Sequence, residues 1–90
     1  MTADEYRRNN PDYNYPDNVI EECLIRAECV VNMLSGGAPV EAESREFAIA
    51  SQTRFLLKHY GEEPGDCEEL SMAVIPALIH GGVKPEVIYG

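Results

Sequence analysis

The segment SREFAIASQTRFLLKHYG, residues 44–61, constrains the fold of this chain more than any other part of the sequence. It has the pattern of one long amphipathic helix that ends at a glycine, a residue that often follows the last helical turn. Small apolar residues such as Ala48 and Ala50 stand beside large ones such as Phe47 and Phe55, so the helix can approach a neighbour closely. The segment therefore predicts a helix that packs against another helix.

That other helix is predicted just upstream. Its N-cap is expected at Asp17 or Asn18, and Gly36-Gly37 is expected to stop it through a left-handed backbone conformation. Apolar residues recur at helical spacing between these limits and define one face: Val19, Ile20, Cys23, Leu24, Ala27, Val30, Val31 and Leu34.

The loop between the two long helices is expected to be short. The later helix is predicted to start between Glu41 and Ser44, where acidic residues suit the positive end of a helix, and to close at Gly61. Two helices joined by a short loop pack antiparallel, as a helical hairpin. We expect the two apolar faces to form the core, with Ile20, Cys23, Leu24, Ala27 and Val31 against Phe47, Ala48, Phe55 and Leu56.

Short elements flank this pair. Thr2 and Glu5 match a capping box, which predicts a short helix over residues 3–8, and two prolines bracket a loop at residues 10–16. Because proline suits the first position of a helix, a second short helix is predicted over residues 76–80, while residues 69–75 could be helical or extended. The predicted fold is therefore all-α, a small helical bundle in one domain over residues 1–90, built on an antiparallel pair of long helices with short flanking helices.

Composition and motifs argue against several classes of function. The net charge is −9 with only seven basic residues, which argues against tight binding of nucleic acid. Three cysteines, at 23, 29 and 67, have no metal-ligand spacing, and they are expected to be reduced small side chains. Catalytic and phosphate-binding motifs are missing, and His59 and His80 each lie at a predicted helix end. We expect no enzyme activity, no cofactor and no metal.

Two parts of the chain are candidates for contact surfaces. The first is apolar, because aromatic and branched residues in loops and tails gain most from a partner: Tyr13, Tyr15, Val87, Ile88 and Tyr89. The tyrosines could instead cover the edge of the core. The second is acidic, and it is expected to repel DNA or face a partner: Glu62, Glu63, Asp66, Glu68 and Glu69. A calcium site there is disfavoured, because the D-x-[DN]-x-[DN]-G ligand order is missing. The chain contains no apolar run long enough to cross a membrane, and a cytoplasmic location is expected.

The order of elements resembles the head–tail connector (head-completion adaptor) proteins of tailed bacteriophages and prophages. The resemblance spans most of the chain but consists of helix-packing patterns, such as I-x-x-C-L-I-R-A-x-x-x-V, and not of a signature motif. The matching positions are Tyr6, Ile20, Leu24, Ala27, Val31, Ala48, Gln52, Phe55, Leu56, Pro76, Ala77, Leu78 and Val83. Two features depart from the family pattern: the segment before the last helix is shorter, and His80-Gly81 replaces an arginine before the final glycine-valine.

The resemblance implies a structural viral protein used in virion assembly after DNA packaging. Many copies would form a homo-oligomeric ring below the portal, at the head–tail junction of the virion or, from a prophage, in the bacterial cytoplasm. The ring would join portal to tail or stopper proteins and extend a channel through which DNA passes without being tightly bound. A chain of this size buries only roughly 60–65% of its unfolded surface, so oligomerisation would add stability. The alternative is a small acidic inhibitor or regulator, of phage or bacterial origin, that binds a partner protein.

Overall fold

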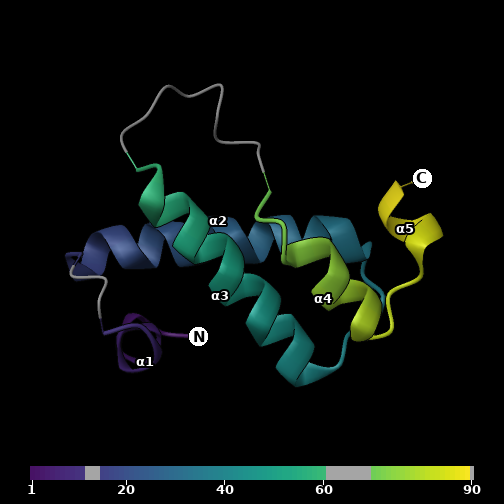
Figure 1. Cartoon of the computed structure of the whole chain (residues 1–90), viewed down its shortest axis with the longest axis horizontal. Coiled ribbons are helices and arrows are strands. Elements are labelled where there is room, and N and C mark those ends of the chain that lie inside the picture. Colours follow the sequence, from purple (N-terminus) through teal and green to yellow (C-terminus); the bar gives the residue numbers. More distant parts are fainter. Residues whose placement is uncertain (12–14, 61–69, 90) are drawn as a thin grey trace.

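The computed structural model describes residues 1–11, 15–60 and 70–89. Across these residues the chain forms helices and no strand, which confirms the all-α fold: α1 (Ala3–Asn9), α2 (Asp17–Ser35), α3 (Ala42–Lys58), α4 (Val74–His80) and α5 (Pro85–Tyr89). Helix α3 runs back obliquely across α2 in the opposite direction (Figure 1). Helix α1 packs by the start of α2, α4 packs along α3, and α5 rests by the end of α2.

Helix α2 forms where the apolar spacing predicted it. Its buried residues recur every three or four positions and face the core: Ile20, Cys23, Leu24, Ala27, Val31 and Ser35. The predicted stop is confirmed, because Gly36 ends the helix with a left-handed φ of 60°. The predicted N-cap is wrong. Pro16 occupies the cap position and its carbonyl accepts the first backbone bonds, while Asp17 instead pairs with Arg7 of α1 at 2.8 Å.

Helix α3 starts inside the predicted window, but it ends three residues before the predicted glycine. The carboxylate of Glu41 caps its first turn by accepting hydrogen bonds from the Glu43 and Ser44 amides, at 3.2 and 3.1 Å. The last helical residue is Lys58 and His59 is the C-cap. Gly61, the predicted stop, lies outside the described residues.

The α2 side of the predicted core is confirmed, while part of the α3 side is wrong. The buried positions of α3 repeat every four residues in pairs and form one strip: Ala48, Ile49, Gln52, Thr53, Leu56 and Leu57. Phe47 lies at the edge of this strip and is 59% exposed, and Phe55 is only half-buried. Fully buried Ala27 and Ala48 leave room for close helix packing, and the bulk of Phe47 lies outside.

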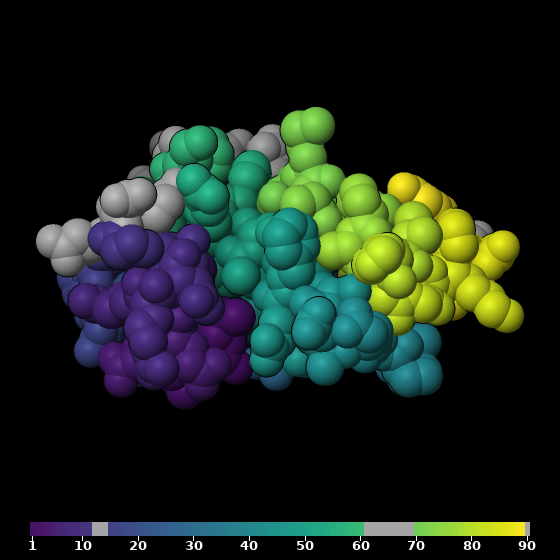
Figure 2. All heavy atoms as spheres, turned by 60° about the horizontal axis from the view of Figure 1, so that its bottom comes forward, coloured from purple at the N-terminus to yellow at the C-terminus, as the bar shows by residue number. Residues whose placement is uncertain are grey.

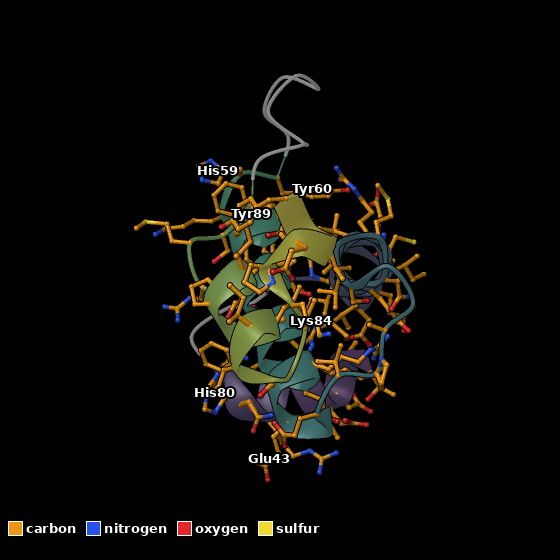
Figure 3. The ribbon with its side chains drawn as sticks, turned by 90° about the vertical axis from the view of Figure 1, so that its right-hand side faces the viewer. Glu43, His59, Tyr60, His80, Lys84 and Tyr89 are labelled. Carbon is orange, nitrogen blue, oxygen red and sulfur yellow. The ribbon has the colours of Figure 1, made fainter. Side chains whose placement is uncertain are left out.

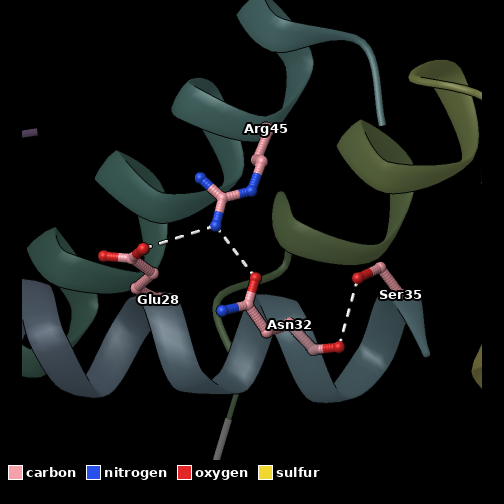
Figure 4. Close-up of polar contacts among 4 residues, drawn as sticks. All are labelled: Glu28, Asn32, Ser35 and Arg45. Atoms are coloured by element: carbon pink, nitrogen blue, oxygen red, sulfur yellow. Dashed lines mark hydrogen bonds and ion pairs between the residues drawn. The ribbon is translucent and has the colours of Figure 1, made fainter. Parts of the chain in front are cut away.

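Polar contacts fix α3 to its neighbours. Arg45 of α3 donates to the Asn32 side chain of α2 at 2.9 Å and lies 3.5 Å from the Glu28 carboxylate (Figure 4). Gln52 is fully buried, and its side-chain oxygen accepts a 2.8 Å hydrogen bond from the Ser71 amide. Because a buried amide oxygen needs a partner, this bond holds the segment before α4 against α3.

Helix α4 begins at Val74, two residues earlier than predicted. Pro76 is therefore its third residue, in the first turn, where a missing N–H removes no intrahelical hydrogen bond. This places residues 74 and 75 in the helix and residues 72 and 73 in a turn. The helix ends in a Schellman motif, in which Val83 and Gly82 donate to the carbonyls of Leu78 and Ile79. Gly82 has the positive φ of 104° that this motif requires.

The end of α4 lies tightly against the start of α3. A Cβ atom added at Gly81 would lie 2.8 Å from both Ser44 Cβ and Val40 Cγ1. The Gly81 carbonyl also accepts a 3.0 Å hydrogen bond from the Glu41 amide. Only a glycine fits this contact, which fixes α4 relative to α3.

Candidate interaction surface

The structure does not bring the predicted apolar contact residues together. Tyr15 lies near the start of α2, half-buried against the core, and its carbonyl accepts a hydrogen bond from Arg7. Helix α5, which carries the other predicted residues, lies at the opposite end of α2 (Figure 1). Tyr13 lies outside the described residues, as do Glu62, Glu63, Asp66, Glu68 and Glu69 of the predicted acidic surface.

The predicted apolar tail is a short helix with two different sides. Ile88 packs against the core, so this residue contributes to the fold. Val87 is partly exposed above the end of α2, where a Cβ added at Gly36 would lie 3.0 Å from its Cγ1 atom. Tyr89 is 70% exposed. Of the three tail residues, Tyr89 is the one most open to a partner.

A larger apolar surface lies beside Tyr89, and sequence reasoning missed it. An open hollow of about 700 Å³ is lined by residues of α4, α5 and the turn before α4, which we call the α4–α5 apolar surface: Met72, Ile75, Pro76, Ile79, His80 and Tyr89. Met72 is 95% exposed. Figure 3 shows His80 and Tyr89 on the same side of the molecule.

The reason for this surface is the composition of α4. Val74, Ala77 and Leu78 face the core, while Ile75 and Ile79, four residues apart, lie on the outer side. A helix that is apolar all round is normally covered on all sides. The signal was present in the sequence SMAVIPALIH, which is apolar on every helical face, but the uncertain path of residues 69–75 concealed it.

A second hollow lies between α3 and α4, around the exposed ring of Phe47. Its volume is about 530 Å³, and its lining defines the Phe47 groove: Glu41, Glu43, Ser44, Phe47, Ala73, Pro76, Ala77 and His80. A neighbouring hollow of about 610 Å³ shares Glu43, Phe47 and Ala73, and reaches Glu46, Arg54 and the N-terminal residue Met1. Figure 2 shows the face on which α3 lies between α1 and α4.

The pKa values of Glu41, Cys23 and Tyr60 are shifted from their ordinary values by burial or hydrogen bonds. The Ser44 hydroxyl, followed by the Ser44 and Glu43 amides, donates to Glu41 and lowers the pKa of its carboxyl. Burial raises the pKa of the Cys23 thiol. Tyr60 donates a 3.1 Å hydrogen bond to Glu22, and this raises the pKa of its phenol. The rings of His59 and Phe55 lie in contact at the end of α3, with centroids 4.6 Å apart and ring planes tilted by 44°.

Within the described residues, no group of three or more His, Cys, Asp or Glu side chains is placed to hold a metal ion. No helix in that part of the chain is long and apolar enough to cross a membrane.

A comparison of the chain with protein-family models, curated proteins and solved structures finds no match. The resemblance to head–tail connectors therefore stays a prediction, and the two surfaces have to be interpreted from their own chemistry.

Proposed function

We propose that this protein is a structural subunit that docks onto other copies of itself through the α4–α5 apolar surface, as a head–tail connector of a tailed phage would do. The observation that carries the proposal is α4, which is apolar on both faces and uncovered on its outer face. Among the described residues that line the hollow there is no carboxylate, so a second copy of this acidic chain meets no charge repulsion from them.

The size of the surface indicates how such docking works. Burying a large apolar side chain completely yields about 1.5–3 kcal/mol, and association costs about 4–15 kcal/mol. Three side chains, those of Met72, Ile79 and Tyr89, therefore support only a weak pairwise contact. A closed ring, or a portal that collects many subunits, raises the effective concentration and makes weak contacts sufficient.

The connector assignment is supported by the helix order and by the positions that carry the resemblance. Most of these positions are buried in the core, including Leu24, Ala48, Leu56 and Leu78. They support a common way of packing helices, while the docking role depends on the exposed surface. The net charge of −9 would let DNA slide past a ring instead of binding to it.

Self-association tests the docking surface directly. The double variant Met72→Ser/Ile79→Ser should weaken self-association, measured by light scattering over a concentration series with and without a portal protein. A matched control exists on α2, where Ile25 and Met33 are also exposed. Ile25→Ser/Met33→Ser should leave association unchanged, and equal effects of the two double variants would contradict the assigned surface.

The connector role requires a biological test. Deleting the gene from a prophage that carries it should give DNA-filled heads without tails, visible by electron microscopy. Normal infectious particles from the deletion strain would overturn the connector role, and would favour the alternative of an acidic protein that binds and inhibits a partner.

A further inference from the structure

The Phe47 groove is a second surface, on α3 and α4. It meets the α4–α5 apolar surface at Pro76 and His80, but Phe47 and Glu43 lie outside that surface. Phe47 stands between the two adjoining hollows and lines both. A phenylalanine ring exposed to this degree in a helix carries a cost in water that a partner would remove. The small side chains of Ala73 and Ala77, with Pro76 beside them, leave open space next to the ring.

Two exposed carboxylates lie beside the ring. Glu43 lies one helical turn before Phe47 and Glu46 immediately before it, and both carboxylates are exposed. In the part of the chain that the structure describes, neither forms an ion pair. Glu41 also lines the groove, but its carboxylate caps α3. Figure 3 shows Glu43 at the end of the molecule below His80.

Basic groups also face these hollows, and their positions show which end of the surface is negative. Arg54 and Met1, with its N-terminal amino group, line only the hollow that extends towards α1, and Arg54 has an interaction of its own within the molecule. His80 lies at the end of α4, close enough to Glu41 to favour the charged carboxylate. The negative end of the surface is therefore at Glu43 and Glu46. A second copy of the chain, which also carries a net charge of −9, is disfavoured there.

We propose that the Phe47 groove binds a basic segment of a partner protein, with an apolar side chain against Phe47 and Lys or Arg side chains beside Glu43 and Glu46. An exposed aromatic ring in a hollow is a typical anchor for a partner side chain, and acidic residues at its edge select a cationic sequence. This inference goes beyond the proposed self-docking, because it depends on Phe47, Glu43 and Glu46, which lie outside the α4–α5 apolar surface, and on another partner. It holds whether or not the protein is a phage connector.

The test is selection from a display library of random twelve-residue peptides against the full chain. The expected winners combine Lys or Arg with an aromatic or aliphatic residue. Their affinity, measured by fluorescence anisotropy, should fall about tenfold or more for Phe47→Ala and for Glu43→Gln/Glu46→Gln, as expected for anchor residues. Because all three side chains are exposed, these variants should fold, which circular dichroism would verify.

A control of equal charge separates the groove from general attraction to an acidic protein. Glu21→Gln/Glu86→Gln removes the same charge from exposed positions that do not line the groove, and it should change affinity less than twofold. Selection of acidic or uncharged peptides, failure to select any, or an equal loss in the control would overturn the proposal. So would weaker self-association of Phe47→Ala, which would make the groove a contact between copies. Met72→Ser/Ile79→Ser should bind the peptides normally, so the two proposals can fail separately.

Discussion

The α2–α3 pair and the α4–α5 segment are both rich in apolar residues, but they bury these residues in different ways. The long helices bury apolar strips against each other and place charged residues such as Glu28 and Arg45 outside. The short helices, of seven and five residues, are below the length at which a helix is stable alone, so tertiary contacts must hold them. Both regions leave large apolar side chains uncovered, such as Ile25 and Met33 on α2, but Ile79 and Tyr89 of the short helices line one common hollow. The comparison indicates that the pair provides most of the core, while the short helices contribute mainly an exposed apolar surface.

The largest effect is expected in the pair. Leu24→Ala should lower the free energy of unfolding by about 2–5 kcal/mol, because Leu24 is buried in the main helix contact. The neighbouring Ile25 is 64% exposed, and Ile25→Ala should cost no more than about 0.5 kcal/mol. Denaturant titration of the two variants measures both values. Similar losses of stability in the two variants would mean that another side of α2 faces the core.

A smaller effect is expected where the short helices join the pair. Gly81→Ala should cost about 1–3 kcal/mol, because its Cβ would overlap Ser44 and Val40 and push α4 away from α3. Hydrogen exchange should show faster exchange in α4, with α2 little changed. Gly82→Ala offers a comparison, because nothing lies within 4 Å of its Cβ and only backbone strain at positive φ remains. Uniform loss of protection in every helix would contradict the division into two regions.

The smallest effect concerns the cap of α3 and depends on pH. The pKa of Glu41 is lowered in the folded state by bonds from Ser44 and Glu43, so its contribution is present above the ordinary carboxyl pKa. It is lost as pH falls through the lowered folded value. Glu41→Gln should therefore be less stable than the original chain at neutral pH, and the difference in melting temperature should shrink in acid.

Glu43→Gln is the matched control for this effect. It removes a carboxylate from the same helical turn, but the Glu43 side chain does not cap the helix. The melting temperatures of Glu41→Gln and the original chain could instead differ by the same amount from neutral to acidic pH. That result would exclude the carboxylate cap as the cause of the difference.

Much of the candidate site was not predicted from the sequence. The spacing of apolar residues predicts a helix and the side of it that faces the core. It does not predict the rotation of the helix about its own axis to within one residue. Phe47 illustrates this, because its size suggested the core and its position at the edge of the buried strip left it exposed. The α4–α5 apolar surface was missed for a related reason: Met72 and Tyr89 are seventeen positions apart in the chain and become neighbours only through the turn at Gly81 and Gly82.

The sequence by itself determined the two long helices, the stop at Gly36 and the all-α fold, because periodicity and helix-ending residues act locally. Tertiary structure decided the rest. Pro16 occupies the N-cap position of α2, and Asp17, one of the expected caps, pairs with Arg7 of another helix. Pro76 lies inside α4, whose preceding segment is held against α3 by the bond between Gln52 and Ser71. Short helices gain too little energy from their own residues to set their limits, so their neighbours set them.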